Sequence, residues 1–168
     1  MSLKELLAKF SSIINPVTQG NNRLVLYDEA LKCIGTDASP NDVAPDEVGC
    51  AETVSDLLIG AFGYNVGIAF TVSTNTLYKE LLASRSFIQV DRPLEGDIII
   101  SPTGYGNGGL SNGHVGIMDT IDNTNFDNSL IMSNDSATGK FLQNYTLGRW
   151  KARYQQIGKY PVAFFRKL

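Results

Sequence analysis

The chain has 168 residues, a length that supports one hydrophobic core and is short for two. Hydrophobic residues make up 43% of it and charged residues 18%, which is typical of a globular domain and not of a disordered chain. The net charge of -3 provides no strong positive field, so we expect no nucleic-acid or anionic-lipid partner.

The first half of the chain is predicted to be helical. Apolar residues at helical spacing indicate a short amphipathic helix that Pro16 ends, so we assign residues 1–20 to an N-terminal helical arm and 21–168 to a single domain. Further helices are predicted over 23–34, from Asp46 or Glu47 to about Gly63, and over 75–84, with a polar loop at 36–45.

The second half of the chain changes to β patterns. Strands are predicted at 87–90, 97–100, 114–118, 129–133, 141–145 and 162–166, separated by turn-forming residues. Because the helices come first and the strands follow, the pattern favours an α+β fold with an antiparallel sheet over alternating βαβ units.

The first residues carry acidic side chains and lack the unbroken apolar stretch of a signal peptide. We therefore expect synthesis in the cytoplasm without a signal peptide. No segment is apolar for long enough to predict a membrane span.

Two cysteines are too few for a disulfide scaffold, and we interpret both Cys33 and Cys50 as thiols, with one disulfide as the alternative. Cys50 is expected in the first turn of its helix, where the partial positive charge lowers a thiol pKa and favours a nucleophile. The alternative is a small apolar residue on a helix face shared with Val54 and Leu57. Cys33, near a helix C-terminus, fits a structural role better.

His114 is the only histidine in the chain and is therefore the one candidate for a neutral general base near pH 7. It opens an apolar strand directly after a glycine-rich loop, where its side chain can face a cleft. A base needs a third group to orient it, and Asn134, then Asp135, are the candidates at the end of the following strand. The alternative is that these two residues only begin a turn.

The glycine-rich stretch 104–113 leads into a strand, whereas a phosphate-binding loop opens a helix, so we interpret it as a cleft wall or a flexible hairpin loop. One histidine and two distant cysteines have no zinc-ligand spacing. Asp119, Asp122 and Asp127 lack the pattern of a calcium loop, so we predict no metal and no cofactor.

Four sequence features in this order resemble the NlpC-type and CHAP cysteine peptidases and amidases. They are the helix that carries Cys50, the Pro-x-x-Gly-Asp turn at residues 93–97, the His114 strand and a polar strand end. The resemblance covers about residues 27–166. The sequence departs from the NlpC pattern around Cys50, where Gly precedes and Ala-Glu follows in place of Asp-Cys-Ser, and the tyrosine customary upstream of the nucleophile has no clear counterpart.

The resemblance implies a papain-like core and a cysteine hydrolase acting on amide bonds of bacterial peptidoglycan. In that reading Cys50 is the nucleophile, His114 the base, and Asn134 or Asp135 the orienting residue. It implies the peptidoglycan stem peptide as partner, a monomer, and release to the cell wall, as for a phage lysin or a virion-borne lysin. The alternatives are a catalytically silent wall- or protein-binding domain and a toxin or effector amidase that acts on another amide.

Overall fold

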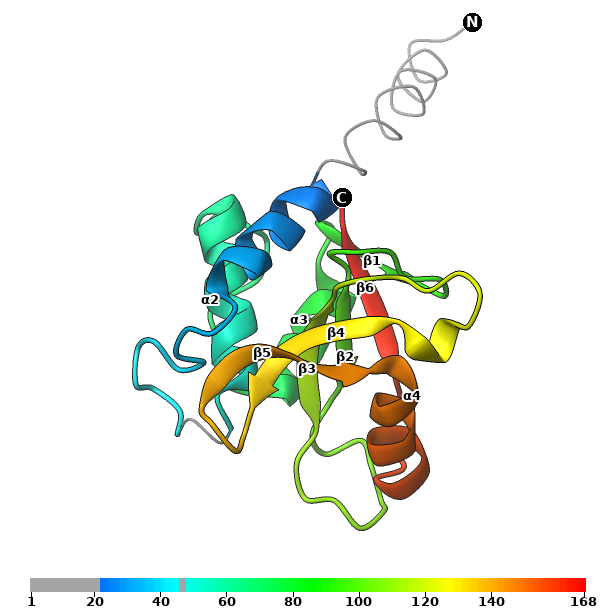
Figure 1. Ribbon diagram of the computed structural model, residues 1–168. Helices are drawn as coiled ribbons and strands as arrows, with labels where there is room; N and C mark the ends of the chain where they lie inside the picture. Colours follow the sequence, from blue (N-terminus) through cyan, green and yellow to red (C-terminus); the bar gives the residue numbers. More distant parts are fainter. Residues whose placement is uncertain (1–21, 46–47) are drawn as a thin grey trace, which may run out of the picture.

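The structure, a computed structural model, describes residues 22–45 and 48–168, which form an α+β fold with a six-stranded antiparallel sheet (Figure 1). The predicted arm at 1–20 lies outside the described residues, and so do Asp46 and Glu47, the predicted start of one helix. None of the helices in the described ranges is long and apolar enough to cross a bilayer.

Three of the predicted helices are confirmed within a few residues: a helix at 22–33, α2 at Cys50–Phe62 and α3 at Thr74–Ala83. α2 ends where Gly63 takes a φ of 73° and donates its N–H to the Ile59 carbonyl at 2.7 Å. α3 begins after Ser73, whose hydroxyl accepts from the N–H of Thr76. Cys50 is the first residue of α2, so its predicted place in the first turn is confirmed.

The strands also follow the prediction closely, and β3 has the expected bounds. They are β1 (Phe87–Val90), β2 (Ile98–Ser101), β3 (His114–Met118), β4 (Leu130–Asp135), β5 (Lys140–Thr146) and β6 (Ala163–Lys167). They pair in the order β1-β6-β2-β3-β4-β5, and every neighbouring pair is antiparallel.

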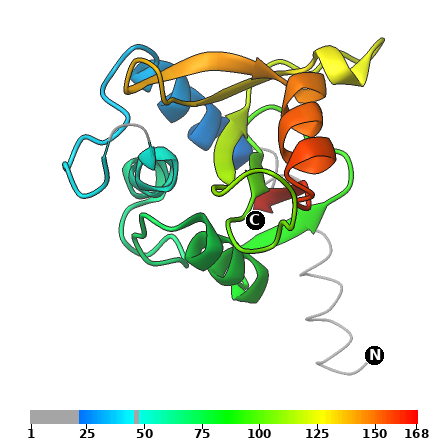
Figure 2. The ribbon, with the colours of Figure 1, turned by 90° about the horizontal axis from the view of Figure 1, so that it is seen from below.

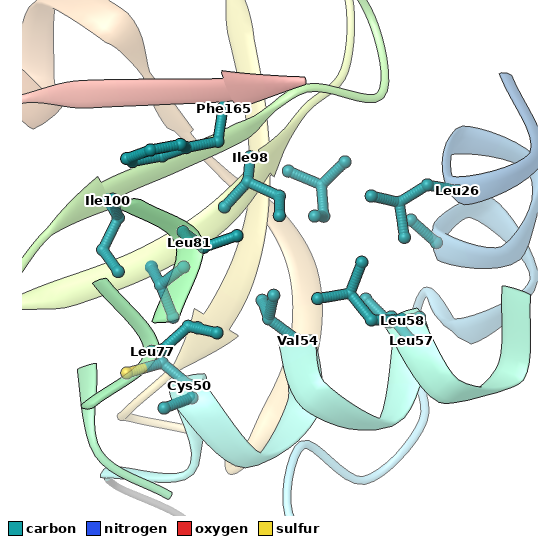
Figure 3. Packing of buried hydrophobic residues seen from close by; sticks show 14 of the residues in the cluster. Leu26, Cys50, Val54, Leu57, Leu58, Leu77, Leu81, Ile98, Ile100 and Phe165 are labelled. Atoms are coloured by element: carbon teal, nitrogen blue, oxygen red, sulfur yellow. The ribbon is translucent and has the colours of Figure 1, made fainter. Parts of the chain in front are cut away.

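The sheet is covered on both faces, and each face has its own apolar core. One core joins the helix at 22–33, α2 and α3 to alternate sheet residues such as Ile98 and Ile100 (Figure 3). Val115 and Ile117 belong to the same core. The other joins Ile99 and Met118 to the segment after β5. α2 and α4 accordingly lie on opposite sides of β3 (Figure 2). Because successive residues of a strand point to opposite faces of the sheet, membership of one core or the other shows which face each strand residue occupies.

The segment that covers the second face was not predicted as helix. A single turn, α4 (Leu147–Trp150), leads into a π-helical stretch, η3 (Lys151–Ile157), and a short 3₁₀ turn, η2 (Phe126–Asn128), lies before β4. η3 is mostly polar and buries Tyr154, while α4 buries Leu147 and Trp150 in the same core. So few apolar positions leave little periodicity for a sequence prediction, whereas packing on the sheet stabilises the helix.

The Pro-x-x-Gly-Asp turn has a structural role. The fully buried Asp97 carboxylate accepts from the N–H of Leu94 at 2.7 Å and from Arg166 Nε and Nη2 at 3.0 and 2.6 Å. Asp97 thus fixes both the turn before β2 and the neighbouring strand β6. Gly96 has a φ of 85°, and a Cβ there would lie 2.1 Å from the Arg23 carbonyl oxygen, so the turn requires glycine.

Candidate functional site

A pocket of about 640 Å³ opens at the end of the sheet where α2 begins and β3 starts. It falls within the range of ~300–1,000 Å³ usual for small-molecule sites. Cys50, His114, Asn134 and Asp135, the four residues predicted from sequence, all line it. The structure therefore brings the four candidates to one place in the molecule.

The Cys50 thiol lies at the inner limit of this pocket, against the apolar core. Its side chain is only 6% exposed, and burial raises the pKa of the thiol to about 11. The backbone amides of Val115, Ala51 and Cys50 itself lie against the sulfur and act in the opposite direction. The expected lowering of this pKa by the helix N-terminus is thus outweighed by desolvation, and the resting group is a neutral thiol.

The His114 ring lies in an aromatic cluster formed by α4, η3 and β5. It stacks on Tyr154, with ring centroids 5.5 Å apart and an interplanar angle of 19°, and its centroid is 5.1 Å from that of Trp150 and 5.8 Å from that of Tyr145. The pKa of His114 is lowered to about 4, mainly by burial and also by the positive charge of Arg153, while the backbone of Asn134 acts in the opposite direction. At neutral pH the ring is therefore an uncharged proton acceptor.

Cys50 and His114 reach the pocket from opposite faces of the sheet. Val115 belongs to the core that contains Cys50, so His114, its neighbour on β3, projects toward the face that carries Trp150. β3 pairs with β4 only from Gly116 onward, and beyond that point β4 continues with β5 alone. β3 and β4 therefore separate at this end of the sheet. There the backbone amide of Val115, the residue after His114, contacts the Cys50 sulfur.

The side chain that contacts the His114 ring belongs to Ser133, which sequence reasoning did not single out as a site residue. His114 Nε2 and Ser133 Oγ are 3.0 Å apart, and the Ser133 hydroxyl donates to Asn144 Oδ1 at 2.7 Å. Because Ser133 pairs with Gly116 across the strands, it lies on the same face as His114.

Asn134 and Asp135, the predicted orienting residues, both line the pocket. The neighbouring Asn134 contributes its backbone to the surroundings of the ring, and its side chain is buried. The Asp135 carboxylate accepts from the N–H of Ala137 at 3.2 Å and from Thr138 Oγ1 at 2.9 Å, inside its own turn. It lines the pocket while bonded to that turn.

The wall on the α2 side is the loop at 36–45, which a buried carboxylate holds in place. Glu52 is fully buried, and its Oε2 accepts from the Ala44 N–H at 2.7 Å and the Ser39 hydroxyl at 2.8 Å. Its Oε1 accepts from the Asn41 N–H at 3.1 Å. Val43 and Ala44 of this loop line the pocket, so Glu52 shapes one wall without lining it.

The glycine-rich stretch contributes less of the pocket wall than predicted. Asn112 and Gly113 line the pocket, and Gly113 donates its N–H to Thr103 Oγ1 at 2.9 Å. The middle of the stretch lies instead against the end of η3, where Gly108 donates to the Gly158 carbonyl at 3.0 Å. Across the described ranges, no three His, Cys, Asp or Glu side chains gather in a group that could hold a metal ion.

Comparison with known proteins supports the fold but identifies no family. No family model matches the chain, and no curated protein matches it. Among solved structures, a chain of the type VI native effector-immunity complex Tae3-Tai3 from Ralstonia pickettii matches with a TM-score of 0.50 and 20% identity. The match covers 87% of this chain and 98% of that one. The chain is thus similar in fold to one component of an effector-immunity complex, and the NlpC or CHAP assignment stays a prediction.

Proposed function

We propose that the protein is a cysteine hydrolase that cleaves an amide bond, with Cys50 as nucleophile and His114 as general base. The observation that carries the proposal is that both side chains line one pocket at the start of α2. A thiol beside a helix N-terminus and a neutral imidazole are the two groups that thiol acyl transfer uses.

The proposed reaction begins from a neutral pair. Cys50 gives its proton to His114 as the sulfur bonds to the amide carbonyl carbon, and backbone N–H groups at the start of α2 hold the resulting oxyanion. The C–N bond then breaks, and the imidazolium returns its proton to the leaving amine. Water hydrolyses the thioester, which releases the carboxylic acid and restores the thiol.

The substrate class we propose is bacterial peptidoglycan, cut as an endopeptidase or as an N-acetylmuramoyl-L-alanine amidase. The order of sequence features around Cys50 and His114 supports this class. The fold neighbour comes from an effector-immunity complex, which supports an effector amidase as one specific form of the proposal. In that form a dedicated partner protein would bind the enzyme, and another amide would be an admissible target.

Purified peptidoglycan provides the direct test. We expect the protein to release soluble fragments whose masses show one new carboxyl and one new amino group, and we expect Cys50→Ala and His114→Ala to release none while staying folded. Fragments released equally by the Cys50→Ala variant would exclude this mechanism.

A second function is favoured by one observation, the burial of the Cys50 sulfur with a raised pKa. A domain that only binds a wall peptide or a protein partner needs the pocket and not a reactive thiol. Such a domain would sediment with peptidoglycan and release no fragments, and Cys50→Ala would sediment as the wild type does.

A further inference from the structure

We propose that Ser133 and Asn144 hold His114 in the tautomer with hydrogen on Nε2, so that Nδ1 is the nitrogen that accepts the proton. The assignment follows from which atoms along this chain of hydrogen bonds can donate. It concerns the neutral ring itself, and its consequence for catalysis rests on the proposed function.

The chain of hydrogen bonds begins at a backbone carbonyl, which can only accept. The Asn134 carbonyl oxygen lies 3.1 Å from Asn144 Nδ2, so the amide of Asn144 must present its NH₂ group to that oxygen. The orientation of the Asn144 amide is thereby set, and its carbonyl oxygen Oδ1 faces Ser133 at 2.7 Å.

Ser133 has one hydrogen to donate. Asn144 Oδ1 is an acceptor, so the Ser133 hydroxyl donates its hydrogen there and has only lone pairs left for the ring. His114 Nε2, 3.0 Å away, must then be the donor of the remaining bond. A neutral imidazole carries one hydrogen, so Nδ1 has the lone pair.

The surroundings favour keeping this arrangement. Ser133 is fully buried and His114 is 9% exposed, so water competes little for these bonds. The Asn134 backbone also accepts from the ring, and this contact favours hydrogen on the ring nitrogen that faces it. The stack on Tyr154 restricts rotation of the ring out of this plane. Ser133 and Asn144 are therefore positioning residues, because they act through His114.

The only histidine in the chain makes the tautomer directly measurable. In ¹⁵N-histidine-labelled protein at pH 8, we expect Nε2 to show the chemical shift of a protonated ring nitrogen and Nδ1 that of an unprotonated one. Ser133→Ala should move the tautomer ratio about fivefold toward the Nδ1–H form, because a neutral hydrogen bond contributes on the order of 1 kcal/mol. Ser129→Ala, which removes another fully buried serine hydroxyl, should leave the ratio unchanged.

Two variants of Asn144 separate orientation from mere packing. Asn144→Asp keeps an acceptor for the Ser133 hydroxyl and should retain the Nε2–H form, whereas Asn144→Ala frees that hydroxyl to donate to the ring and should lose the preference. A wild-type spectrum with hydrogen on Nδ1, or an Asn144→Ala variant with the wild-type ratio, would overturn the assignment.

The catalytic consequence has its own readout. Ser133→Ala should lower kcat on peptidoglycan fragments about fivefold with KM unchanged, and Ser129→Ala should change neither. A shifted tautomer with unchanged kcat would overturn the catalytic role. If the wild type shows the Nε2–H form and cleaves nothing, the tautomer assignment stands and the proposed function fails.

Discussion

Removal of the buried Glu52 carboxylate should release the loop that forms one wall of the pocket. Its Oε2 accepts two hydrogen bonds of 2.7 and 2.8 Å, from the N–H of Ala44 and the hydroxyl of Ser39. A hydrogen bond to a charged group contributes ~1.5–3 kcal/mol, so the loss of two in Glu52→Ala should lower the free energy of unfolding by about 3–6 kcal/mol. Glu52→Gln keeps one acceptor oxygen and should lose about half as much.

Urea unfolding followed by Trp150 fluorescence measures this effect, because Trp150 is the only tryptophan in the chain and is fully buried. Glu80→Ala is the matched control, since that carboxylate accepts one exposed hydrogen bond from the Ala69 N–H and should cost less than ~1 kcal/mol. Proteolysis within 36–45 should also accelerate in Glu52→Ala. A loss no larger than that of Glu80→Ala would show that the loop does not depend on this carboxylate.

Three further predictions concern pH, an ion pair and the thiol. The His114 pKa is about 4 when folded and near 6.5 when unfolded, so the unfolded chain takes up a proton at higher pH than the folded one. The stability that neutral His114 contributes is therefore complete above pH 6.5 and is lost as pH falls to 4. Wild type should therefore lose about 3 kcal/mol more than His114→Gln between pH 7 and pH 4 in urea titrations, and equal losses would refute the shifted pKa. Asp97→Asn should cost about 3–5 kcal/mol of stability because it leaves Arg166 without its buried partner, whereas Lys151→Met, which breaks an exposed pair, should cost less than ~1 kcal/mol in the same assay. Iodoacetamide should label Cys50 slowly at pH 7 and about tenfold faster for each pH unit up to pH 10, as read by peptide mass mapping in a Cys33→Ser background; fast labelling at pH 7 would contradict the raised pKa.

Sequence patterns alone determined the arrangement of elements. The 3.6-residue periodicity of α2, the alternation in β3, and the glycine and proline signals between segments are local features, so they predicted an α+β fold with an antiparallel sheet. The same patterns placed Cys50 in the first turn of its helix and His114 at the start of its strand. Both positions depend only on where an element begins.

Contacts across the sheet were decided by the tertiary structure. Ser133 lies against the His114 ring because of the strand register and because β3 and β4 separate beyond Gly116, and neither feature is encoded within one segment. η3 was missed because its helix depends on packing against the second core.

The sequence by itself therefore predicted Cys50 and His114 as candidates for chemistry and the element in which each one lies, but it gave no sign of Ser133. Only the tertiary structure decided their protonation and their partners. The physical reason is desolvation: a helix N-terminus favours a thiolate at Cys50, but burial against residues distant in sequence raises its pKa, and the same burial lowers that of His114.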